Sequence, residues 1–328
     1  MLTRETAYGA GPRRMAAAVP KRAVFRDVEP APVTVIAAHS GLGAGDPRTG
    51  LGPRALDPSG ILDSLAKPGR ATGWLDVSGS STDSRKDPDA RLAGVASAAS
   101  AVASAVERSL KSGAQTLVLG GDHSIAAGTW SGAANALGRG SRLGLIWLDA
   151  HMDGHVPETT PSGNWHGMPV AHLLGHGVPE LTGLARFGPA LRPENLCLIG
   201  VRSYEPGEAR LLQLLGVRVI MADEVAARGF AACFAEALEI ASNGTDGFGV
   251  SIDLDAFDPR QAPGVGSPVA GGLATKPAIA SMAGLSYAPG FLGLEIAEFN
   301  PARDIGGKTA DLVARLVESV FETKGGSA

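Results

Sequence analysis

The chain has 328 residues, of which 44% are hydrophobic and 19% are charged, and its formal net charge is −4. This composition supports a large buried core and excludes a chain that is disordered throughout. No block of positive charge follows the N-terminal stretch, which argues against nucleic-acid and membrane partners. Two cysteines are too few for a disulfide framework, so we expect a cytoplasmic protein.

Residues 1–30 contain six Arg and Lys side chains and few acids. A transit peptide has this composition, and so has a frayed extension on a cytoplasmic protein, which is the interpretation we favour. We therefore predict a basic N-terminal extension over residues 1–30, which need not be ordered, and a single domain over residues 31–328. The sequence shows no apolar stretch long enough for a transmembrane helix.

From residue 33 on, short apolar runs alternate with segments of helical pattern. Most runs are apolar at every position, as in strands that are buried on both faces of a parallel sheet. Helical segments such as 89–113 and 229–244 end in glycine, a common signal for the end of a helix. The alternation predicts an α/β fold, with three α/β/α layers and a mainly parallel central sheet. The predicted strands are 33–38, 116–121, 143–151, 195–201, 217–222, 247–257 and 291–299.

Acids and histidines gather where these apolar runs end. Ligands of such sheets bind beyond the carboxyl ends of the strands. Alternate residues of an extended strand point the same way, so the acids and the histidine of DAHMD (149–153) are expected on one side, and so are both acids of DLD (253–255). A further histidine follows the run at 116–121. The candidate metal ligands are His123, Asp149, His151, Asp153, Asp253 and Asp255.

Four carboxylates and two imidazoles are more ligands than one divalent ion needs, and their charge balances two bridged dications. Mixed oxygen and imidazole ligation suits Mn²⁺ best, with Fe²⁺, Co²⁺, Ni²⁺ or Zn²⁺ as alternatives. Helix capping and loop structure explain a single acid after a strand well, but they explain three such motifs on three strands poorly. We therefore predict a site for two metal ions.

At this point the motifs resemble a known family, the ureohydrolases, which include the arginases and agmatinases. The resemblance rests on GGDHS (120–124), DAHMD (149–153), PSGNWHGMP (161–169), SIDLDAFDP (251–259) and EFNP (298–301), and it covers nearly the whole chain after the basic extension. The SGNWHG segment is closer to the arginases. The resemblance implies an arginase-like fold, a homo-oligomer (trimer or hexamer), and hydrolysis of L-arginine to urea and L-ornithine by a hydroxide that bridges two Mn²⁺ ions.

The resemblance also implies how the ligands divide. One metal ion is expected on His123 and Asp153, the other on His151 and Asp255, with Asp149 and Asp253 bridging them.

The same resemblance assigns roles in catalysis and in substrate binding. His166 is expected to shuttle a proton to the leaving amine, and Asp153 to accept a proton from the attacking hydroxide. Glu298 is expected to pair with the guanidinium of the substrate. Ser162 and Asn164 match residues near the substrate carboxylate.

The sequence departs from the arginase pattern around the amino-acid end of the substrate. His155 stands where arginases usually carry an asparagine that contacts the carboxylate, and Ser203 and Glu205 replace two aspartates, the second of which helps to hold the α-amino group. We still expect His155 and Glu205 to bind substrate. The alternatives are a ureohydrolase for another small cationic guanidino compound, such as agmatine or a guanidino acid, and a non-catalytic metal-binding subunit. A dinuclear phosphoesterase would need cationic clamps that the site lacks.

Overall fold

The computed structural model describes residues 31–56, 65, 72–78 and 87–321. They form one parallel sheet of eight strands in the order β2-β1-β3-β8-β7-β4-β5-β6. The predicted N-terminal extension, residues 1–30, lies outside the described residues. The strands are β1 Val33–Ala38, β2 Thr72–Val77, β3 Gln115–Gly120, β4 Leu143–Leu148, β5 Leu191–Val201, β6 Arg218–Met221, β7 Gly247–Asp253 and β8 Phe291–Ala297.

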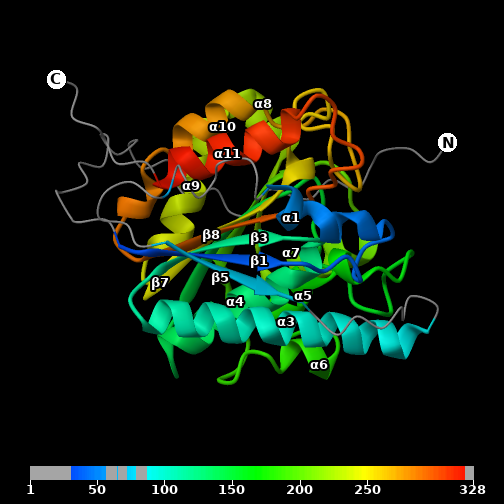
Figure 1. Cartoon of the computed structure of the whole chain (residues 1–328), viewed down its shortest axis with the longest axis vertical. Coiled ribbons are helices and arrows are strands. Elements are labelled where there is room, and N and C mark those ends of the chain that lie inside the picture. Colours follow the sequence, from blue (N-terminus) through cyan, green and yellow to red (C-terminus); the bar gives the residue numbers. More distant parts are fainter. Residues whose placement is uncertain (1–30, 57–64, 66–71, 79–86, 322–328) are drawn as a thin grey trace.

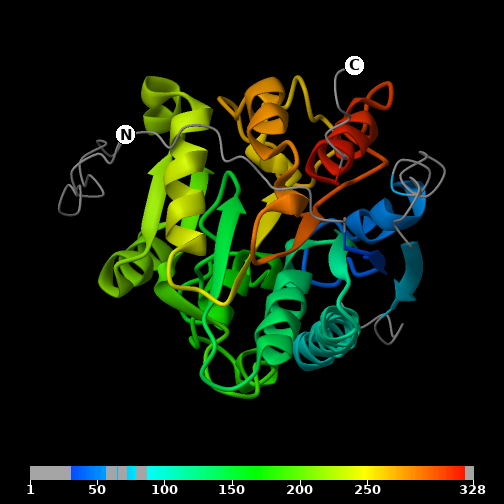
Figure 2. The same ribbon diagram turned by 90° about the vertical axis from the view of Figure 1, so that its left-hand side faces the viewer.

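Helices cover both faces of this sheet. In Figures 1 and 2, α9, α10 and α11 lie on one side, and α3 and α4 lie on the other. The α-helices are α1 Gly52–Leu56, α3 Pro88–Lys111, α4 Ala126–Leu137, α5 Pro169–Leu173, α6 Pro179–Thr182, α7 Pro206–Leu215, α8 Ala222–Arg228, α9 Phe230–Ser242, α10 Thr275–Met282 and α11 Lys308–Phe321. Short 3-10 helices are η1 Pro47–Leu51, η3 His123–Ile125, η4 Trp165–Gly167, η5 Leu254–Ala256 and η6 Leu285–Tyr287.

Side chains of the central strands alternate between two apolar cores, one on each face. Val35 and Ile146 pack into the core under α9 and α11, whereas their neighbours Ile36 and Trp147 pack into the core under α3 and α4. Every residue of β3, β4 and β7 is buried. Burial on both faces explains why these strands are apolar at every position, and it confirms the predicted three-layer α/β/α fold.

The predicted strands all appear, but two of them end three or more residues earlier than expected. The strand predicted over 143–151 ends at Leu148, and the one predicted over 247–257 ends at Asp253, where η5 begins. Strand β2 was not predicted. It pairs only with β1 at the edge of the sheet, and its residues are largely exposed, so its sequence lacks the apolar pattern of a buried strand.

Candidate metal centre

The candidate ligands and Glu298 lie at the ends of four strands that are side by side in the sheet, β3, β8, β7 and β4. His123 opens η3 just after β3, and residues 149–153 follow β4 directly. Asp253 is the last residue of β7, Asp255 lies in η5, and Glu298 follows β8. Because parallel strands end at the same edge of the sheet, segments that are distant in the sequence meet there.

One group of ligands surrounds the His123 ring. Its Nδ1 atom lies 3.3 Å from Asp149 Oδ2, 3.2 Å from Asp153 Oδ2 and 3.4 Å from Asp253 Oδ2. The ligand atoms of His123, Asp149 and Asp253 are all within 4.8 Å of one another. All four side chains are buried. This half of the centre has the residue types and the spacing of a site for one cation.

A second group shares Asp149 with the first. His151 Nδ1 lies 3.4 Å from Asp149 Oδ1 and 3.1 Å from Asp255 Oδ2, and the three ligand atoms are again within 4.8 Å of one another. Asp149 thus turns one carboxylate oxygen to each group. The structure brings together all six predicted ligands, and Asp149 is shared by the two groups, whereas Asp253, the other expected bridge, lies only in the His123 group. The division of the ligands between two ions stays a prediction.

The route by which they converge differs from the prediction of an extended strand with alternating side chains. Residues 149–153 leave the strand and turn, and Asp149 Oδ1 accepts a hydrogen bond from the backbone N–H of His151 at 2.7 Å. Similarly, Asp253 caps η5 and accepts a hydrogen bond from the N–H of Asp255 at 2.7 Å. The prediction of alternation was therefore wrong for both segments, because carboxylates directly after a strand bond the next turn instead.

Several features of this cluster fit bound cations. His123 Nδ1 and Asp153 Oδ2 are buried and have no hydrogen-bond partner in the described part of the chain, although buried polar atoms normally have one. Burial and the nearby Asp149 raise the pKa of Asp153 to about 7, and burial together with the Asp255 charge raises that of Asp253. Two dications would compensate four crowded carboxylates in place of protons.

The centre also contains strained backbone. Asp153 and Glu298 have φ values of 49° and 67°, and no other non-glycine residue among those described has positive φ. This left-handed conformation costs roughly 1–2 kcal/mol for a residue with a Cβ, and such strain is concentrated at functional sites.

Glu298 lies next to the ligands with half of its carboxylate engaged. Its Oε1 accepts hydrogen bonds from the His123 N–H at 2.9 Å and from His166 Nδ1 at 2.9 Å. Its Oε2 is buried and has no partner among the described residues. Burial lowers the pKa of His166, but the charge of Glu298 outweighs this effect and raises it to about 9. His166 is therefore protonated at neutral pH and can give a proton.

A cavity of about 310 Å³ opens over Glu298 and His166. Asn164 also lines this cavity, and its Oδ1 accepts a hydrogen bond from Arg91 Nη2 at 2.9 Å. Ser162, which is exposed, accepts a hydrogen bond from the Asn164 N–H at 3.3 Å. The loop 162–166 thus brings three predicted site residues to one side of the centre.

His155 and Glu205, which are distant in the sequence, form a direct contact. His155 Nε2 lies 2.9 Å from Glu205 Oε2 and 3.5 Å from Glu208 Oε1, and His155 Nδ1 lies 3.0 Å from Thr159 Oγ1. Glu208 was not predicted as a site residue. Its signal was the spacing to Glu205, because the two acids form a reciprocal capping box at the start of α7.

With this geometry established, the chain was compared with known proteins. The family described as "Arginase family" matches residues 31–322. The chain belongs to the arginase family. The arginase of Bacillus caldovelox is 37% identical, over 89% of this chain and 99% of the relative.

Solved structures of this family have the same fold. The arginase of Bacillus subtilis strain 168 superposes with a TM-score of 0.82 at 35% identity, covering 90% of this chain and 99% of the other. The proclavaminate amidino hydrolase of Streptomyces clavuligerus superposes with a TM-score of 0.69 at 25% identity, covering 90% and 93%. These likenesses confirm the predicted resemblance and the arginase-like fold.

In this arginase-family chain, a buried relay orients His123. The Nε2 atom of His123 lies 2.9 Å from Ser251 Oγ, and that hydroxyl donates to Glu295 Oε1 at 2.7 Å. The His123 ring also stacks on Trp147, with ring centres 4.2 Å apart. Such contacts fix which ring nitrogen faces a metal, and here they leave Nδ1 to the carboxylates. Neither Ser251 nor Glu295 was predicted as a site residue.

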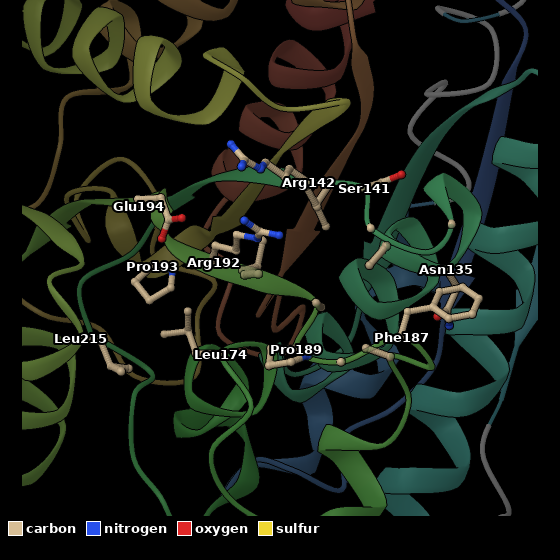
Figure 3. A pocket seen from close by; sticks show the side chains of 18 residues that line it. Asn135, Ser141, Arg142, Leu174, Phe187, Pro189, Arg192, Pro193, Glu194 and Leu215 are labelled. Atoms are coloured by element: carbon tan, nitrogen blue, oxygen red, sulfur yellow. The ribbon is translucent and has the colours of Figure 1, made fainter.

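The larger hollow of the arginase-family chain, about 390 Å³, lies elsewhere (Figure 3). Its walls include Arg142 and Arg192, which flank the paired residues Leu143 and Leu191 at the amino ends of β4 and β5. None of the described residues that line it is a histidine or an aspartate. The candidate ligands, His166 and Glu298 lie instead at the carboxyl ends of the strands, beside the smaller cavity.

Proposed function

We propose that this protein is an arginase, which hydrolyses the guanidinium group of L-arginine to urea and L-ornithine at a dinuclear metal site. The observation that carries the proposal is the position of Glu298 Oε2, a buried carboxylate oxygen that has no hydrogen-bond partner among the described residues and lies beside two ligand groups that share Asp149. A guanidinium pairs well with such an oxygen. Membership of the arginase family and relatives named arginases support the same reaction.

We propose Mn²⁺ as the metal, because carboxylate and imidazole ligands suit it, although Ni²⁺, Co²⁺ and Fe²⁺ fit the same donor set. His123, Asp149, His151, Asp153, Asp253 and Asp255 would hold two ions. When bound, the ions supply hydroxide from water near neutral pH.

The described residues include no helix that is long and apolar enough to cross a bilayer.

Three side chains of the protein would position the substrate and transfer the protons. Glu298 would fix the guanidinium carbon in front of the metal ions, which replaces a random encounter by a positioned one. Asp153 would accept the proton that the attack releases. His166, whose pKa is about 9 beside Glu298, would donate a proton to the departing amine.

The amino-acid end of the substrate is proposed to contact His155, Ser162, Asn164 and Glu205. One observation favours a second candidate, a ureohydrolase for another guanidino compound such as agmatine or a guanidino acid. Both ring nitrogens of His155 are engaged, Nε2 with Glu205 at 2.9 Å and Nδ1 with Thr159 at 3.0 Å, so the imidazole cannot contact a substrate carboxylate unless one of these bonds opens. A relative of this fold is named a proclavaminate amidino hydrolase.

The remaining proposals concern context. We propose one ureohydrolase domain over residues 31–328, a cytoplasmic location, and a homo-oligomer (trimer or hexamer). A non-catalytic metal-binding subunit is disfavoured, because all six ligands converge here together with His166 and Glu298.

Urea release from a panel of guanidino compounds tests the function. The protein is loaded with Mn²⁺ and, separately, with Ni²⁺ or Co²⁺, and it is given L-arginine, agmatine, 4-guanidinobutyrate and guanidine. Preference for L-arginine supports the arginase. Preference for another compound selects the second candidate, and no urea from any of them, with metal bound, contradicts both.

A further inference from the structure

Arg202, the residue directly after β5, ties together the loops at the metal centre. Its guanidinium donates hydrogen bonds to backbone carbonyls of three segments. The acceptors are the carbonyls of Gly200 at 3.1 Å, Asp255 at 2.7 Å, Ala256 at 3.1 Å, Phe257 at 3.5 Å, Val269 at 2.9 Å and Ala270 at 3.1 Å. In the described part of the chain, no carboxylate forms an ion pair with Arg202. Its guanidinium therefore holds the backbone carbonyls of these three segments in place.

The backbone of the same residue holds the segment after β4. The N–H groups of Arg202 and Ser203 both donate to the carbonyl of Ala150, at 2.9 and 3.0 Å. Ala150 lies between the ligands Asp149 and His151, and its own N–H donates to Asp255 Oδ1 at 3.2 Å. Arg202 thus connects the two segments that carry the second ligand group.

The first ligand group is held by different contacts. His123 is oriented by Ser251 and Glu295, and the carbonyl of Asp153 accepts the N–H of Val170 at 2.9 Å. Among the described residues, no side-chain hydrogen bond of Arg202 reaches His123 or Asp153. Although Asp149 is shared and Asp253 accepts the N–H of Asp255, the side-chain contacts of Arg202 therefore lie on the segment of the second group.

We propose that Arg202 is a positioning residue for one half of the metal centre, the half formed by His151 and Asp255, and that it sets the affinity of this half alone. The proposal rests on the proposed dinuclear site. A planar guanidinium with five N–H groups in a fixed fork can hold several carbonyls at once. A lysine ammonium is a single point of charge and cannot reproduce that fork.

The test counts bound Mn²⁺ in the full-length protein and its variants, by equilibrium dialysis with elemental analysis and by EPR. Removing contacts that orient metal ligands typically lowers metal affinity by about 10- to 100-fold. We expect Arg202→Gln to bind one cation with the affinity of the wild type and the second about 10- to 100-fold more weakly. Its EPR spectrum should change from that of a coupled pair to the six lines of a single Mn²⁺.

Arg202→Lys separates geometry from charge and is expected to show the same selective loss. It also decides the question by the same criteria if Arg202→Gln does not fold. The matched control is Arg91→Gln. Arg91 likewise holds backbone carbonyls, those of residues 42–44, but that loop carries no predicted ligand. This control is expected to keep two cations.

Two results overturn the proposal. One is a folded Arg202 variant that binds both cations as tightly as the wild type. The other is a variant that loses both cations to the same extent. A wild-type protein that binds no divalent cation would instead remove the proposed function itself, and the inference with it. Wild-type stoichiometry and urea release therefore distinguish the two failures.

Discussion

Replacing Glu298 with glutamine probes the contact that separates substrate binding from metal binding. Glutamine keeps the size of the side chain and can accept through its oxygen where Oε1 now accepts from the His123 N–H and His166 Nδ1. Its amide NH₂ would then occupy the position of Oε2, which has no hydrogen-bond partner in the described part of the chain. An N–H donor there cannot pair with a guanidinium, which has only donors itself.

The expected loss follows from that single contact. Removing one partner of a buried, hydrogen-bonded charge pair costs 2–5 kcal/mol, and we take about 3–4 kcal/mol here because the oxygen is fully buried. At 1.4 kcal/mol for each tenfold change, kcat/KM for the guanidino substrate should fall roughly 100- to 1000-fold. The pKa of His166 should also fall, since the charge of Glu298 is what raises it to about 9.

Steady-state urea release and bound-metal analysis, performed on the same preparation of Glu298→Gln, check this prediction. The variant should keep the wild-type metal content, because Glu298 is not one of the six predicted ligands. Glu298→Asp serves as the control that keeps the charge and shortens its reach. A loss of less than tenfold in Glu298→Gln with full metal content would refute the assignment of Glu298 to the guanidinium.

Three further changes test other parts of the structure. Asp149→Asn should weaken both metal ions, because Oδ1 and Oδ2 face different ligand groups; elemental analysis that finds one ion at wild-type affinity would contradict the bridging position. Burial lowers the pKa of His172 to about 4, against about 6.5 in an unfolded chain, so the unfolded protein binds more protons and stability falls as the pH drops from about 6.5 to 4. His172→Leu should remove as much as about 3 kcal/mol of this acid destabilisation, and the thermal midpoint should then depend less on pH. An unchanged pH dependence of the thermal midpoint would exclude His172 as the cause. Gly128→Ala should destabilise the protein by about 2 kcal/mol, within the range for overpacking, because a Cβ there would overlap the carbonyl oxygen of Ala99 on α3. The control in denaturant unfolding is Gly73→Ala, where a Cβ would meet no described residue other than its chain neighbours within 4 Å. Equal effects would argue against close helix packing.

Much of the fold was predictable because its strands are buried on both faces. The predicted strand 33–38 coincides with β1, because both faces of this strand are largely buried and its sequence is therefore apolar at nearly every position. Strand β2 was missed for the opposite reason. Asp76 within it is exposed and bonds His39 at 2.7 Å, so this edge strand carries no apolar signal.

The candidate centre was predictable in its members but not in its geometry. The motifs at 149–153 and 253–255 identified residues that do converge, yet convergence arises from turns after the strands and from positive φ at Asp153. A sequence pattern contains no information about a left-handed residue that is not glycine or about which oxygen of Asp149 faces which histidine.

Contacts between residues that are far apart in the sequence could not be predicted from the sequence. His155 and Glu205 are 50 residues apart, and each alone resembles an ordinary loop residue. Arg202 is a clearer case, since all of its side-chain acceptors are backbone carbonyls. Carbonyls are present at every position, so the identity of the residues it holds leaves no trace in the amino-acid pattern.

The most direct test of the account is a titration of the metal-free protein with Mn²⁺, followed by urea release from L-arginine at each step. We predict that activity rises until two equivalents of Mn²⁺ are bound per chain and then stays constant. Full activity at one equivalent, or activity that is independent of added and bound metal, would contradict a dinuclear centre built on the shared Asp149.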